Sequence, residues 1–136
     1  MNWSHFPHGA DIGLRGTGAT KAQAFGQIGL ALTAVVTEPD RVDARESVEI
    51  RCEAPDDEML LLDWLNSLIY EMAIRRMLFR TFDVAIDGRR LRAEVRGEAV
   101  DPARHEPAVE VKGATCTELA VVTTGGGWLV QCVVDV

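Results

Sequence analysis

The sequence predicts an α+β fold, a two-layer sandwich in which two helices pack on one face of a largely antiparallel sheet. The order of the periodic segments predicts it: strand, helix, strand, helix, and then a run of strands. Length and composition agree, because 136 residues with 47% hydrophobic content and no break in composition can close one core. We therefore expect residues 1–136 to form a single domain.

The first strand and the first helix are predicted near the start of the chain. Residues 1–8 are expected to form a short lead, and residues 10–18 then alternate apolar and polar side chains, as a strand does. Thr20 followed by Gln23 is a capping-box pattern, so a helix is expected over residues 21–36. Two glycines inside this helix each cost about 1 kcal/mol relative to alanine, so either the backbone packs closely there or the helix is less strongly predicted.

A second strand and a long helix follow. Residues 46–53 alternate strictly and predict a strand with one buried and one solvated face. Residues 55–79 predict one helix, with an aspartate at its start and Arg75 and Arg76 placing positive charge near its end. Its apolar face should be core, whereas Asp63 should be more exposed. The apolar face consists of Leu61, Trp64, Leu65, Leu68, Ile69 and Met72.

The rest of the chain predicts strands. Residues 82–95 predict a hairpin, because the alternation resumes after Asp87-Gly88, a pair typical of tight primed turns. A polar loop is expected over residues 101–107. The last strands are expected at residues 108–115, 118–123 and 128–136. Three glycines turn the chain between the final two, and no helix follows them, so they are not interpreted as a phosphate-binding loop.

Charge and cysteine usage limit the function classes. Fourteen basic residues against 21 acidic ones give a net charge of −7, which disfavours direct nucleic-acid binding and suits a basic protein partner or a bound cation. No apolar run predicts a membrane span or a signal peptide, so a cytoplasmic protein is expected. Three cysteines without Cys-x-x-Cys spacing argue against a disulfide framework and a zinc ribbon, and indicate buried thiols.

The candidate chemistry lies at the two ends of the chain. Asp135 and the terminal carboxylate of Val136 place two negative charges at the end of the last strand, and Asp11 joins them if the first and last strands are neighbours. Three such carboxylates favour a hard cation; the alternative is a turn-capping Asp11 and a solvated Asp135. The spacing His5-x-x-His8-x-x-Asp11 is a weak transition-metal pattern, since one strand would direct His8 and Asp11 to opposite faces.

Several short motifs resemble those of the archease family. His8-Gly-Ala-Asp-Ile-Gly13 is similar to the family's His-Thr-Ala-Asp-Ile-Gly, and Asp63-Trp-Leu-Asn66 resembles its Asp-Trp-Leu-Asn helix. Further matches, in the family's order, are Gly97-Glu98, Arg104-His105, Glu110-Val111-Lys112 and the final Asp135-Val136. The resemblance therefore extends over the whole chain.

This resemblance implies a function as a protein cofactor rather than an enzyme. Archeases promote the GTP-dependent guanylylation and multiple turnover of the RtcB-type RNA ligase in tRNA splicing and RNA repair. The family's site implies that a divalent hard cation, calcium or else magnesium or manganese, binds Asp11, Asp135 and Val136. The candidates for contact with the ligase are His8, Asp63, His105 and Lys112.

Two departures from the family pattern and two alternative functions remain. Gly9 replaces the motif's threonine, and Thr115-Cys116-Thr117 stands where many archeases have Thr-Tyr-His; if that tyrosine or histidine contacts the ligase in the family, the interface here is altered. The first alternative is a chaperone-like modulator of an RNA-modifying enzyme such as a tRNA methyltransferase. The second is a metal-dependent hydrolase, which would need a water-activating base and a substrate pocket that the sequence does not indicate.

Overall fold

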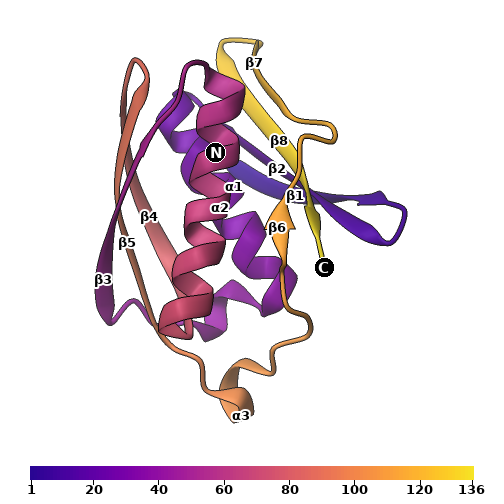
Figure 1. Ribbon diagram of the computed structural model, residues 1–136, viewed down its shortest axis with the longest axis vertical. Helices are drawn as coiled ribbons and strands as arrows, with labels where there is room; N and C mark the ends of the chain where they lie inside the picture. Colours follow the sequence, from indigo (N-terminus) through magenta and orange to yellow (C-terminus); the bar gives the residue numbers. More distant parts are fainter.

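The computed structural model describes residues 1–136 and has the predicted α+β architecture (Figure 1). All paired strands are antiparallel, and they form two sheets instead of one: a five-stranded sheet with the order β1-β2-β8-β6, in which β7 also pairs with β8, and a three-stranded sheet with the order β3-β5-β4. The elements are β1 Asn2–His8, β2 Asp11–Gly18, α1 Lys21–Val36, η1 Pro39–Arg41, β3 Glu46–Glu53, α2 Asp57–Arg75, β4 Met77–Asp87, β5 Arg90–Ala99, α3 Pro102–His105, β6 Gly113–Ala114, β7 Ala120–Thr124 and β8 Gly127–Asp135.

Helix α1 has the predicted bounds, and it packs against both sheets. Thr20 and Gln23 form the predicted capping box, which satisfies two free backbone N–H groups at the start of the helix. The two internal glycines allow Phe82 of β4 to approach: a Cβ on Gly29 would lie 2.7 Å from the Phe82 ring, and one on Gly26 would lie 3.2 Å from its carbonyl oxygen. Of the two alternatives for these glycines, the structure shows close backbone packing.

Helix α2 is shorter than predicted. It begins after Asp56, whose side chain accepts a hydrogen bond from the Met59 amide at 2.8 Å, and it ends at Arg75. Arg76 takes a left-handed conformation with a φ of 52°, and buried residues 77–79 then open β4. The prediction of a helix to residue 79 was wrong because this short apolar run fits either structure, and no glycine marks the left-handed position.

Three other segments differ from expectation. Residues 1–8 are not a lead, because Asn2–His8 form the edge strand β1. Residues 108–115 contribute only the two-residue strand β6, since the Ala108 amide donates to the Val36 carbonyl of α1 instead of to a strand. The expected polar loop contains the short helix α3, capped by Asp101.

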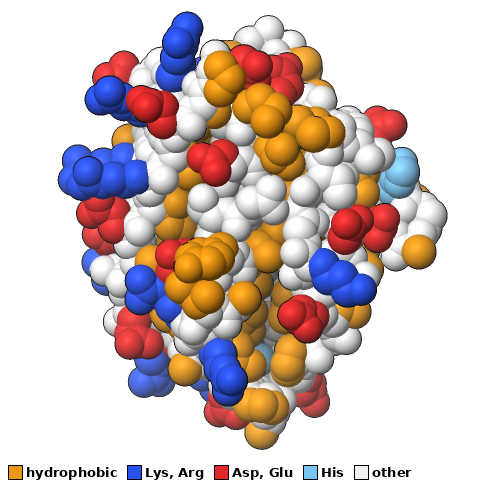
Figure 2. Space-filling model, viewed as in Figure 1, with side chains coloured by type: hydrophobic (Ala, Val, Ile, Leu, Met, Phe, Trp, Pro, Cys, Tyr) orange, Lys and Arg blue, Asp and Glu red, His pale blue; other side chains and the backbone are white.

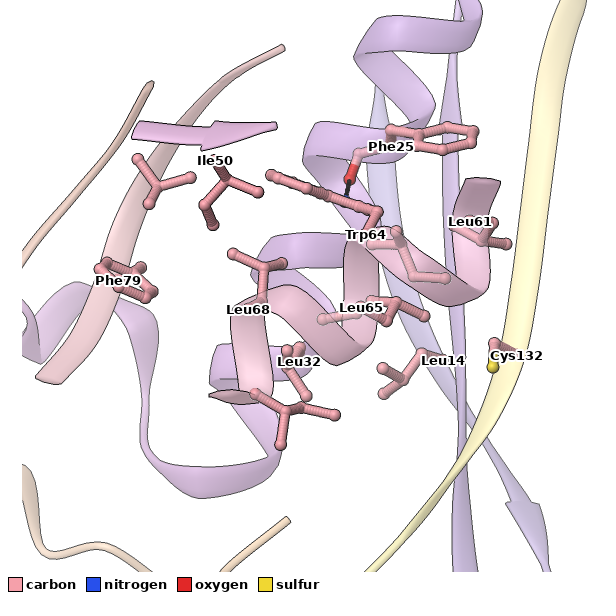
Figure 3. Packing of buried hydrophobic residues seen from close by; sticks show 14 of the residues in the cluster. Leu14, Phe25, Leu32, Ile50, Leu61, Trp64, Leu65, Leu68, Phe79 and Cys132 are labelled. Carbon is pink, nitrogen blue, oxygen red and sulfur yellow. Dashed lines mark hydrogen bonds between the residues drawn. The ribbon is translucent and has the colours of Figure 1, made fainter. Parts of the chain in front are cut away.

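The core lies between the sheets and the helices. A continuous cluster of 29 buried apolar residues draws on both helices and both sheets, with Trp64, Phe25 and Phe79 as its largest members (Figure 3). Leu65 and Leu68 are fully buried and Asp63 is exposed, as predicted. None of the helices combines the length and the apolar character needed to cross a membrane.

Candidate functional site

Asp11 and Asp135 come from neighbouring strands at one end of the five-stranded sheet. Strand β2 pairs with β8, so the condition for Asp11 to join Asp135 is met, and Ile12 lies opposite Val134 in the register. The next residue on each strand, Asp11 at the start of β2 and Asp135 at the end of β8, therefore forms the following cross-strand pair. Asp11 is half-buried and Asp135 is exposed. Side chains opposite each other on antiparallel strands share a face.

The cross-strand pairing of Asp11 and Asp135 extends to one residue on each flanking strand. His8 of β1 lies opposite Asp11, and Gly113 of β6 lies opposite Asp135. We call these four positions, His8, Asp11, Asp135 and Gly113, the carboxylate row. The expectation that His8 and Asp11 lie on opposite faces was wrong, because Gly9, with a φ of 59°, turns the chain between them and makes them cross-strand partners.

The carboxylate row lies on the sheet face that points away from the helices. Leu14 is fully buried on the helix-facing side, and alternation along β2 directs Asp11 to the other side. His5, opposite Leu14, donates from Nε2 to the Ala31 carbonyl of α1 at 2.7 Å. His5 and His8 thus belong to different faces, and no group of three His, Cys, Asp or Glu side chains gathers to hold a metal. The transition-metal pattern of His5, His8 and Asp11 is not formed.

Aromatic and polar contacts hold together the three strands next to the carboxylate row. The Phe6 ring lies directly over Gly13, where an added Cβ would be only 2.3 Å from the ring. The Arg15 guanidinium lies 4.6 Å from the centre of the same ring and donates two hydrogen bonds to the side-chain oxygen of Gln131, at 3.1 and 3.2 Å. These contacts join β1, β2 and β8 next to the carboxylates, and sequence reasoning missed them because they depend on the strand register.

Lys112 lies beside Asp135. Its backbone amide donates to the Asp135 carbonyl oxygen at 2.9 Å, and the residue is exposed. Asn66 of α2 reaches the same segment, since its Oδ1 accepts a hydrogen bond from the Ala114 amide at 2.9 Å. The sequence analysis assigned no contact to Asn66, and its place in the Asp-Trp-Leu-Asn motif was the one signal of a special role.

Asp63 does not belong to the carboxylate row. It lies on the exposed face of α2 and borders a shallow hollow of about 290 Å³ together with Glu49, Arg51 and Tyr70. This hollow lies between α2 and β3 of the three-stranded sheet. Asp63 therefore stays a candidate contact residue on a separate part of the surface.

The proposed contact role of His105 does not fit the structure. The residue is only 1% exposed, its Nδ1 accepts a hydrogen bond from the Asp101 amide at 2.8 Å, and its Nε2 donates to Glu98 at 2.9 Å. Both ring nitrogens are thus used inside the protein, so no partner can contact them. His105 fixes α3 to the end of β5.

Glu98 is the centre of that buried polar cluster. Arg104 donates to its carboxylate at 2.6 Å, and the Asp43 amide donates at 2.7 Å. The Arg104 hydrogen bond, helped by those from Asp43 and His105, lowers the pKa of Glu98 to about 2 although burial opposes this shift. The Gly97-Glu98 and Arg104-His105 motifs are therefore structural and lie apart from the carboxylate row.

The donor atoms of the carboxylate row fit a hard cation. The side chains of Asp11 and Asp135 offer carboxylate oxygens, which calcium, magnesium and manganese prefer, and no thiol belongs to the row. Only two side-chain carboxylates are available, so a third charged oxygen would have to come from the carboxylate of Val136. Figure 2 shows acidic and basic side chains interspersed on the side of the three-stranded sheet, and acidic side chains beside a basic one near the C-terminal edge.

Comparison with known proteins extends these observations to the whole chain. The model of the Archease protein family (MTH1598/TM1083) matches residues 3–136. Proteins named archease from Pyrococcus abyssi and Pyrococcus furiosus are 36% and 37% identical to the chain over 139 residues, covering 98% of the chain and of each relative. Their similarity is not limited to the short motifs.

Two solved structures share the fold. The solution structure of protein 1598 from Methanobacterium thermoautotrophicum has a TM-score of 0.83 at 26% identity and covers 99% of both chains. A crystal structure from Thermotoga maritima, described as an archease and possible chaperone, has a TM-score of 0.60 at 18% identity and covers 96% of this chain and 94% of its own. At that identity, the second comparison supports the fold alone.

Proposed function

The chain belongs to the archease family, and from this premise we propose that it is a protein cofactor of an RtcB-type RNA ligase. In this role it promotes GTP-dependent guanylylation and multiple turnover of the ligase in tRNA splicing or RNA repair, and it catalyses no reaction itself. We propose that it acts in the cytoplasm. The observation that carries the proposal is the register of β2 and β8, which brings Asp11 and Asp135 to adjacent ends of paired strands.

The proposed cation site consists of Asp11, Asp135 and the carboxylate of Val136. Two carboxylates on neighbouring strands repel each other unless a cation or protons relieve them. A divalent cation bound there would supply concentrated positive charge that polarises phosphate oxygens. The carboxylate oxygens of Asp11 and Asp135 would orient that charge, and calcium, magnesium and manganese all suit such ligands.

The partner surface is proposed to be the same edge. His8 lies next to Asp11 in the carboxylate row, and the backbone of Lys112 is bonded to Asp135. Both residues are exposed, so they can reach a docked protein without any change of fold. A neighbouring lysine also offers a positive group for phosphate or carboxylate groups of the partner. Asp63 would mark a second, separate contact on α2.

A turnover assay with purified ligase tests this function. The assay supplies GTP, a divalent cation and RNA with ligatable ends in excess over the ligase, and it compares product per ligase with and without this protein. The parent protein should allow many ligations per ligase, and Asp135→Asn should lose most of this effect. The matched control is Asp87→Asn, which removes an exposed carboxylate from the other sheet and should stimulate like the parent. Stimulation by neither the parent nor the control would reject the proposed partner and favour a chaperone-like role with an RNA-modifying enzyme.

A further inference from the structure

Strand β6, which contributes Gly113 to the carboxylate row, is a weak element. It consists only of Gly113 and Ala114, which pair with Asp135 and Val134 of β8. The preceding Lys112 amide donates to Asp135, and the following Thr115 amide donates to Val133. So short a strand buries little surface and makes few hydrogen bonds, so it cannot hold its position by sheet pairing alone.

The backbone of this segment is irregular. In a regular strand, amides two residues apart point toward the same neighbour. Here the Lys112 amide points toward β8, where it donates to Asp135, whereas the Ala114 amide donates to the Asn66 side chain of α2. The orientation of the backbone amides therefore departs from regular alternation between Lys112 and Ala114, and the Ala114 amide, which is turned away from β8, needs another acceptor.

Asn66 supplies that acceptor. Its Oδ1 lies 2.9 Å from the Ala114 nitrogen. Apart from Gly113 and its two chain neighbours, the same oxygen is the only heavy atom within 4 Å of the point where a Cβ on Gly113 would lie, at 3.8 Å. Helix α2 is fixed by its buried face, where Trp64 and Leu65, which directly precede Asn66, are fully buried. Asn66 thus connects a rigid helix to the short segment that touches Asp135.

We infer that Asn66 is a positioning residue for the carboxylate row: by holding the turned amide of Ala114, it fixes Lys112 and, through the Lys112 amide, the Asp135 end of β8. This inference rests on the proposed function for its biological meaning. Its physical content, the dependence of the Lys112 to Asp135 contact on Asn66, can be measured on the protein alone.

Three variants test the inference. Asn66→Ala removes the acceptor at an exposed position of a helix, where alanine is a good helix former, so folding should be retained. Asn66→Asp keeps an acceptor oxygen and should restore the parent behaviour. The matched control, Asp56→Ala, removes the same kind of bond from the same helix, because the Asp56 side chain accepts from the Met59 amide at 2.8 Å, far from β6.

The first measurement is amide hydrogen exchange followed by NMR. If Asn66 positions the row, the amides of both Ala114 and Lys112 should exchange about tenfold faster in Asn66→Ala, because local opening then reaches the Asp135 contact. Neither amide should change in Asp56→Ala or Asn66→Asp. Faster exchange at Ala114 alone, with Lys112 unchanged, would overturn the inference, because Asn66 would then stabilise only the Ala114 amide and not the contact between Lys112 and Asp135.

The second measurement is titration calorimetry with calcium and with manganese alone. Loss of a residue that orients metal ligands typically weakens binding about tenfold or more, so Asn66→Ala should bind about tenfold more weakly than Asp56→Ala. Equal binding by these two variants would contradict the inference. The ligase assay is a separate arm: a parent protein that fails to stimulate the ligase rejects the proposed function, while the exchange of Lys112 still decides whether Asn66 positions Asp135.

Discussion

The indole N–H of Trp64 donates a hydrogen bond to the backbone carbonyl of Phe25 at 3.0 Å and so joins the two long helices (Figure 3). Both side chains are fully buried. A buried indole needs such a partner, because an unpaired polar group in the interior costs about 1–3 kcal/mol. This bond fixes how α2 lies on α1, and therefore where the polar face of α2 meets β6.

Leu65→Ala should destabilise the protein by about 2–5 kcal/mol, because it removes a fully buried side chain from the face of α2 that packs on α1 and leaves a cavity. Denaturant unfolding measures this free energy. Tyr70→Ala, at a position that is 60% exposed on the same helix, is the control and should cost less than about 1 kcal/mol. A loss below about 1 kcal/mol for Leu65→Ala would mean that the helix face is assigned wrongly.

Glu98→Gln should change how stability depends on pH. The pKa of Glu98 is lowered from 4.5 to about 2, chiefly by the hydrogen bond from Arg104. Since the folded state holds the charged form, the stabilisation is complete above pH 4.5 and is lost as pH falls toward 2. The variant should be less stable than the parent at pH 7, and the difference should shrink over that interval. Thermal unfolding at several pH values checks this; a constant difference from pH 7 to pH 2 would contradict it.

Gly13→Ala should disturb the packing of β1 on β2 next to the carboxylate row. A Cβ at this position would lie 2.3 Å from the Phe6 ring, so the ring must move and the Arg15 contact above it must change. Forcing extra volume into a packed site costs about 1–3 kcal/mol. Phe6→Ala in the same chain removes the obstacle, so the double variant should be more stable than the sum of the two single changes predicts. Additive effects, measured by a double-mutant cycle, would show that the two residues do not interact.

Only one of the three thiols should react in the folded protein. Cys116 is exposed, whereas Cys52 and Cys132 are buried, and burial raises the pKa of each buried thiol to about 11. A thiol reagent at pH 8 should therefore label one equivalent quickly, and three equivalents after denaturation. Cys116→Ser should abolish the fast phase. Rapid labelling of a second thiol in the native protein would contradict the packing of β3 or β8.

The sequence predicted most elements because their periodicity is strong. Helix α1 and strand β3 needed only local patterns and the idea that one core must be covered. The end of α2 was wrong because Arg76 adopts a left-handed conformation without a glycine signal. Sequence patterns also describe one strand at a time, so they could not show that His8 lies opposite Asp11 or that His105 is buried against Glu98.

The sequence did not predict the division into two sheets, for a related reason. Alternation shows which face of a strand is buried, but it does not show which strands pair. The β4 and β5 hairpin joins β3, while the last strand β8 joins β2 from the start of the chain. The candidate site depends on that long-range pairing, and the acidic residues near both ends of the sequence were the only local sign of it.

The last prediction concerns the C-terminal carboxylate, which is the third proposed ligand. A few residues added after Val136 convert this carboxylate into a neutral amide and leave every side chain unchanged. Folding should be retained, because β8 is held by buried residues such as Val130, Cys132 and Val134, and a solvated tail at a chain end is usually tolerated. Cation binding should weaken, because hard cations depend on charged oxygen ligands.

Asp135→Asn and Asp11→Asn should have the same effect from the side chains, because each removes a negative charge at nearly constant shape. Calcium affinity, measured by calorimetric titration, and ligase stimulation, measured by the turnover assay, should therefore decline together in all three variants. The thermal unfolding temperature without cation should stay close to that of the parent. The same tail added at the N-terminus, before Met1, is the matched control and should leave both activities unchanged. If the protein with the C-terminal tail binds cation as tightly as the parent and supports full multiple turnover, the terminal carboxylate is not a ligand, and the site must be completed by another group, with His8 beside Asp11 as the first residue to test.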